Sequence, residues 1–115
     1  MSLVINGAGF EVNGGGTTPG LRPFEIGGRT TVTMNDLTVT GGNMSLPIDE
    51  GGGIRNSGIL TLNNATVTGN FAGYGGGIYS RGSDVQLTLN NTTVAFNRTS
   101  GDGGGINSNA ALTVN

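Results

Sequence analysis

The sequence predicts an all-β fold: a right-handed parallel β-helix of about four coils, with three short strands in each coil. Three observations support this fold class. A unit recurs about every 27 residues, each unit alternates apolar and polar residues on both sides of an asparagine, and no window offers the 3.6-residue apolar stripe of a helix. The 115 residues include 24 glycines, with threonine and asparagine next in number, a composition that favours turns and strands over helices.

The repeat supplies the first two strands of each coil. Leu60–Asn70 (LTLNNATVTGN) is matched by Leu87–Asn97 (LTLNNTTVAFN) and, upstream, by Val32–Asn43, while further copies open at Leu3 and Leu112. Each copy reads as a strand, a corner at asparagine, a second strand and a corner at glycine or asparagine.

The element GGGI supplies the third strand. Ile54, Ile78 and Ile106 each follow three glycines and precede polar residues, so we expect the glycines to turn the chain and the isoleucine to enter the core.

Stacked coils would place equivalent side chains on one another. The expected columns are Leu60, Leu87 and Leu112; Met34, Leu62, Leu89 and Val114; Val39, Val67 and Val94; and Ile54, Ile78 and Ile106. Burial of each aliphatic side chain contributes roughly 1.5 to 3 kcal/mol. We therefore expect these columns, rather than corner contacts, to hold the fold.

The corner asparagines have structural roles in this interpretation. Asparagine tolerates the left-handed backbone conformation, and stacked asparagine side chains form hydrogen-bonded ladders. We assign Asn63, Asn64, Asn90 and Asn91 to such corners.

Composition excludes several function classes. A net charge of −2, with five arginines and no lysine, argues against nucleic acid as a partner, and no run of 18 apolar residues predicts membrane insertion. The absence of histidine and cysteine removes imidazole and thiolate chemistry, so no cofactor is expected.

The two ends suggest a segment of a longer array. Both fall within repeats and no signal peptide is visible, so we interpret residues 1–115 as a single β-helix segment. Uncapped coils would leave strand edges unpaired, which predicts self-association through the coil ends.

The triple glycine itself does not predict a ligand site. A phosphate-binding loop would need a following helix and, in a P-loop, a lysine, and calcium-binding β-rolls repeat every nine residues rather than about every 27. Calcium remains open as a weaker alternative at Asp49, Glu50 and Asp102, which directly precede glycine runs.

The remaining candidates suit a polysaccharide or a cell-surface glycan. Phe71, Tyr74 and Tyr79 could stack on sugar rings, and Arg55 and Arg81 could bind anionic groups or simply coat the coil surface. We assign no catalytic residue and lean against an enzyme. The irregular segments 14–22 and 44–50 are where loops would carry specificity.

The repeats resemble a known group. GGGI, LTLNNATVTGN and the next GGGI are similar to the right-handed parallel β-helix repeats of secreted bacterial surface proteins, including pectin-lyase-like proteins and the chlamydial-type polymorphic outer membrane proteins. Of the latter's two motifs, GG-x-I is present, whereas Val67 and Val94 stand at the phenylalanine of F-x-x-N.

That resemblance implies an extracellular or cell-surface setting, associated with the bacterial outer membrane, as in an autotransporter passenger. It implies a structural, adhesive role without catalysis. Two alternatives stay open: a polysaccharide lyase or hydrolase whose catalytic residues lie outside this segment, and a glycan-binding module.

Overall fold

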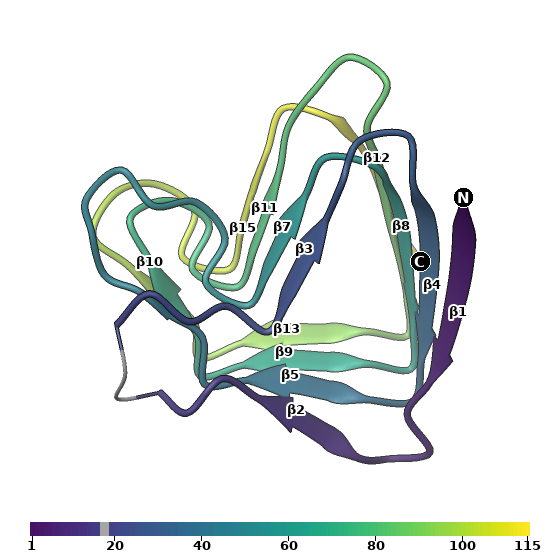
Figure 1. Cartoon of the computed structure of the whole chain (residues 1–115), viewed down its shortest axis with the longest axis horizontal. Coiled ribbons are helices and arrows are strands. Elements are labelled where there is room, and N and C mark those ends of the chain that lie inside the picture. Colours follow the sequence, from purple (N-terminus) through teal and green to yellow (C-terminus); the bar gives the residue numbers. More distant parts are fainter. Residues whose placement is uncertain (17–18) are drawn as a thin grey trace.

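The computed structural model describes residues 1–16 and 19–115 and contains strands but no helix in that part of the chain. The chain winds as a β-solenoid of about four turns, and Figure 1 looks along the stack, so that strands of successive coils lie behind one another. The extents are 32 × 30 × 24 Å, with the shortest along this view. The predicted fold class is confirmed.

Three sheets correspond to the three predicted strands of each coil. The first contains β1 (Ser2–Asn6), β4 (Thr31–Asn35), β8 (Ile59–Asn63), β12 (Gln86–Asn90) and β16 (Ala111–Val114). The second contains β2 (Glu11–Asn13), β5 (Thr38–Thr40), β9 (Thr66–Thr68) and β13 (Thr93–Ala95). The GGGI sheet contains β3 (Phe24–Ile26), β7 (Ile54–Asn56), β11 (Ile78–Ser80) and β15 (Ile106–Ser108). All neighbours within these sheets are parallel.

The structure adds a fourth sheet of two-residue strands, which lies between the second sheet and the GGGI loops. It contains β6 (Asn43–Met44), β10 (Phe71–Ala72) and β14 (Arg98–Thr99). Two residues are too few to show an alternating pattern, which is why the sequence did not reveal these strands.

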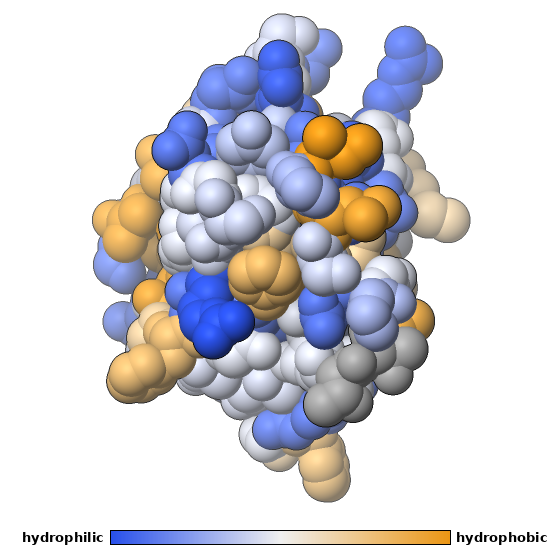
Figure 2. Space-filling model, turned by 90° about the vertical axis from the view of Figure 1, so that its left-hand side faces the viewer, coloured by the Kyte–Doolittle hydropathy of each residue, from blue (hydrophilic) through white to orange (hydrophobic). Residues whose placement is uncertain are grey.

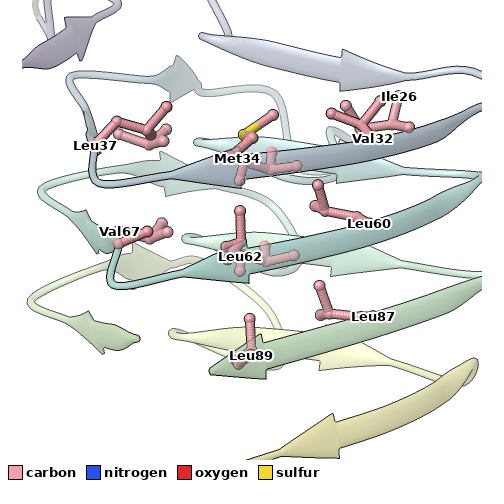
Figure 3. Close-up of a cluster of buried hydrophobic side chains, with 13 residues drawn as sticks. Ile26, Val32, Met34, Leu37, Leu60, Leu62, Val67, Leu87 and Leu89 are labelled. Atoms are coloured by element: carbon pink, nitrogen blue, oxygen red, sulfur yellow. The ribbon is translucent and has the colours of Figure 1, made fainter. Parts of the chain in front are cut away.

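The predicted columns form the core. In the first sheet Val32, Leu60 and Leu87 pair in register, as do Met34, Leu62 and Leu89, and all six side chains are buried (Figure 3). Leu112 and Val114 continue these columns in register but are 44% and 66% exposed, because β16 is the edge strand of the sheet, so their predicted burial is wrong. Val39 pairs with Val67 and Val67 with Val94, and Ile54 pairs with Ile78 and Ile78 with Ile106. Phe24, which the repeat did not place, extends the isoleucine column by pairing with Ile54.

An asparagine ladder follows the end of the first sheet. The ladder contains Asn6, Asn35, Asn63, Asn90 and Asn115. Each member after Asn6 donates from its side-chain nitrogen to the side-chain oxygen of the member before it, at 2.8 Å in every case. The next residue turns the corner in the left-handed conformation, with φ of 50° at Asn64 and 46° at Asn91. The structural roles expected for these asparagines are confirmed.

A second pair of asparagines closes the following corner from inside. Asn70 is 1% exposed; its oxygen accepts from the Gly42 amide at 2.9 Å, and its side-chain nitrogen donates to the Val39 carbonyl and to the Asn97 side chain. Because these groups have no access to water, the bonds fix the path of the chain into the fourth sheet.

Candidate functional site

Three stacked loops form a lobe on one side of the solenoid, on the left of Figure 1. They are residues 45–53, 73–77 and 100–105, which lead from the fourth sheet into the GGGI sheet. The loops are joined by backbone hydrogen bonds, from the Tyr74 amide to the Asp49 carbonyl at 2.8 Å and from the Gly75 amide to the Asp102 carbonyl at 3.1 Å. These bonds place Glu50, Tyr74 and Asp102 in adjacent layers of the stack.

The first glycine of each triple sets the shape of its loop. Gly51, Gly75 and Gly103 have φ of 72°, 61° and 71°, a region that other residues adopt only with strain. A Cβ at any of them would meet the carbonyl oxygen of the isoleucine three residues later. The triple glycine is therefore a corner, as the sequence predicts.

A hollow of about 370 Å³ lies between this lobe and the outer face of the GGGI sheet. Its lining residues are Glu50, Tyr74, Tyr79, Arg81, Asp102, Asn107 and Asn109. Five of the eight residues singled out from the sequence thus come together here. We call it the tyrosine hollow.

Tyr79 and Arg81 line the tyrosine hollow as a hydrogen-bonded pair. Tyr79 is 7% exposed, and its hydroxyl accepts a hydrogen bond from Arg81 Nη1 at 3.2 Å. This hydrogen bond raises the pKa of Arg81, which is itself fully exposed and stays charged at any physiological pH. Tyr74, 38% exposed, offers the more accessible ring.

Arg55 is held in ion pairs, and its side chain remains 37% exposed. Its Nη1 lies 3.1 Å from Glu25 Oε1 and its Nε lies 3.3 Å from Glu50 Oε2. Arg22, in the irregular segment 14–22, stabilises the backbone beside these ion pairs. Its Nε and Nη2 donate to the carbonyls of Gly51 and Glu50, both at 2.7 Å. Burial lowers the pKa of Arg22.

The role of Arg22 could not be predicted from the sequence, because Arg22 lies in an insertion without counterparts in the other coils. That loop, 14–22, was one of the two expected to carry specificity, and its residues 17–18 lie outside the described residues.

The three acids proposed as calcium ligands have different surroundings. Asp49 accepts a hydrogen bond from the Leu46 amide at 3.1 Å and so closes its own turn, while Glu50 pairs with Arg55. Among residues 1–16 and 19–115 no group of three or more acidic side chains gathers in metal-binding geometry.

Phe71 lies apart from the tyrosines, in a second hollow of about 320 Å³ beside β10. The Arg98 guanidinium lies 5.6 Å from the centre of the Phe71 ring. The lining residues are Gly16, Gly42, Asn43, Gly69, Asn70, Phe71, Phe96 and Arg98. We call it the phenylalanine hollow. Figure 2 faces this side of the molecule and shows hydrophobic residues scattered among strongly hydrophilic ones.

None of the described residues forms a helix long and apolar enough to cross a membrane.

Comparison with known proteins adds no relative to this picture. The chain matches no protein-family model, no curated protein and no solved structure.

Proposed function

We propose that this chain is a non-catalytic structural and adhesive segment of a secreted or cell-surface bacterial protein. The observation that carries the proposal is the unbroken register of the stack. Every coil contributes to the same side-chain columns and to one asparagine ladder, so stability depends on inward residues and the outward ones are free to vary.

Adhesion would use the tyrosine hollow, and a glycan is the ligand class that suits it. Arg81 donates hydrogen bonds, Glu50 and Asp102 accept them, and Asn107 and Asn109 do both, while Tyr74 presents a partly exposed ring. Saccharides combine many hydroxyl groups with apolar ring faces, and this mixture of groups is complementary to both. Glycan binding is therefore the second candidate function, favoured by this convergence.

The enzymatic alternative has weaker support. Hydrolysis of a glycosidic bond uses two carboxyl groups in distinct protonation roles. Glu50 and Asp102 line the tyrosine hollow, but Glu50 is already paired with Arg55. A carboxylate engaged in this way is better suited to holding the lobe than to proton transfer.

Retention of the purified protein on immobilised polysaccharides tests the proposal. We expect wild-type protein to bind at least one member of a panel of plant, bacterial and animal glycans, and Tyr74→Ala and Arg81→Gln to bind it at least about tenfold more weakly. Arg29→Gln is the matched control, because Arg29 is exposed and does not line the tyrosine hollow. Retention of no glycan, or equal retention of all variants, would overturn the adhesive role.

A further inference from the structure

Phe96 occupies an unfavourable position for its residue type. It turns the corner between β13 and β14 with a φ of 56°, and its counterparts in the two preceding coils are Gly41 and Gly69, with φ of 71° and 66°. A bulky side chain in the left-handed region is a strained outlier. The phenyl ring is also 90% exposed, so burial does not compensate for the strain.

Such a residue indicates a role other than stability. Glycine serves the same corner in the neighbouring coils without strain, and strained residues concentrate at ligand sites. Phe96 lines the phenylalanine hollow, so its ring is available to a ligand there.

The phenylalanine hollow contains further groups without full partners. Asn43, Phe71 and Arg98 pair in register on adjacent coils and form one row along the stack. Arg98 is the only charged residue among the described lining residues, and it forms no ion pair within residues 1–16 and 19–115.

Asn43 adds an unpaired acceptor to this row. Its side-chain nitrogen donates to the Gly16 carbonyl at 2.9 Å, which orients the amide. Its Oδ1 is buried with no hydrogen-bond partner among the described residues. A buried acceptor of this kind is rare and calls for a donor.

We infer that the phenylalanine hollow is a saccharide subsite for an N-acetylated sugar. An acetamido group carries a carbonyl for Arg98 and a methyl group for the exposed phenyl ring of Phe96, whereas a hydroxyl group supplies no apolar contact. The acetamido N–H reaches Asn43 Oδ1 only when the Asn43 amide turns toward the hollow, because that oxygen has almost no exposed surface. The sugar ring would stack on the exposed ring of Phe96 through its C–H face, because the Phe71 ring already faces the Arg98 guanidinium. This inference rests on the proposed glycan-binding role and assigns it a second, separate site.

An extended peptide fits this surface less well. The central strand β10 is paired on both sides, so a peptide could add a strand only at the edge of this sheet beside β14, and not across the row of Asn43, Phe71 and Arg98. Recognition would depend on side chains alone.

Titration calorimetry with a β-linked N-acetylglucosamine oligomer tests the inference, with a β-linked glucose oligomer of the same length as the matched ligand. We expect the acetylated oligomer to bind at least about tenfold more tightly than the glucose oligomer. Phe96→Gly should lose at least about tenfold in affinity for it, and Phe96→Tyr, which keeps the ring, should retain it. Phe10→Ala, an exposed phenylalanine outside the hollow, should bind as wild type does.

Thermal unfolding provides a readout independent of binding. Because Phe96→Gly relieves strain, its unfolding midpoint should rise by about 3 to 6 °C. A fall in the midpoint would overturn the premise that the ring is not needed for the fold.

The outcomes separate this inference from the proposed function. If a saccharide binds and Tyr74→Ala weakens it while Phe96→Gly does not, the phenylalanine hollow is not the subsite and the adhesive role stands. Equal affinity for the two oligomers would overturn the acetamido specificity. If neither these oligomers nor any polysaccharide binds, both proposals fail.

Discussion

Leu62 and Asn63 are neighbours in β8 and test which part of the stack carries its stability. Leu62 is fully buried in the middle of its column, between Met34 and Leu89. Asn63 is half-buried in the middle of the asparagine ladder, with one hydrogen bond to each adjacent coil at 2.8 Å. Replacing each by alanine removes one rung of the column or one rung of the ladder.

The expected magnitudes differ clearly. Leu62→Ala leaves a cavity in a dry core and should lower the free energy of unfolding by about 2 to 5 kcal/mol. Asn63→Ala removes two amide hydrogen bonds, but water can reach the groups left behind, so the loss should be about 1 to 2 kcal/mol. The core substitution should therefore cost about twice as much as the ladder substitution.

Urea unfolding followed by far-UV circular dichroism measures both losses, provided that the slopes of the variants match that of wild type. Thr61→Ala, which changes an outward residue of the same strand, is the control and should cost less than about 1 kcal/mol. If Asn63→Ala destabilised the protein as much as Leu62→Ala, the conclusion that the columns hold the fold would be refuted.

Three further substitutions follow from the same geometry. Asn70→Ala should cost about 3 kcal/mol in urea unfolding, because buried backbone groups of two coils lose their partner; a loss below 1 kcal/mol, about the value for an exposed hydrogen bond, would contradict this. Gly75→Ala should destabilise by more than about 1 kcal/mol, since φ is 61° and the new Cβ would lie 2.5 Å from the Ile78 carbonyl oxygen; an unchanged thermal midpoint would show that the corner relaxes. Arg55→Gln should lower the free energy of unfolding by less than about 1 kcal/mol, because the ion pairs of Arg55 with glutamates are partly exposed. Added salt should reduce this loss, since it screens exposed charges; a loss that does not change with salt would contradict the assignment to exposed ion pairs.

The repeat was enough to predict the register of the columns and the corners, but not that Leu112 and Val114 stay exposed in the edge strand. Leu60, Leu87 and their counterparts fall at one phase of the unit, and parallel stacking turns equal phase into direct contact. The asparagine after each first strand is likewise fixed by phase. Phe24 was not predicted to join the isoleucine column, because the coil that contains it has an irregular insertion before the strand.

The sequence was enough to predict which residues belong to the candidate site, but not how they are arranged in space. Tyr74, Tyr79 and Arg81 stood out by residue type, but their convergence depends on loops of unequal length, and the repeat phase does not encode where such loops fold back. Phe71 and Tyr74 are three residues apart, yet the chain turns between them, so they line different hollows. Phe96 did leave a signal, since aligning the repeats places it opposite Gly69, but only its positive φ in the structure makes that contrast meaningful.

The most direct test of the proposed function is to analyse a bound glycan after binding. The protein is incubated with its best polysaccharide ligand, with and without Ca²⁺, and the recovered ligand is examined for new reducing ends and unsaturated sugars. A non-catalytic adhesive segment predicts saturable binding with the ligand recovered unchanged in both conditions. Shortened or unsaturated products that accumulate with time would contradict it and favour the polysaccharide lyase or hydrolase.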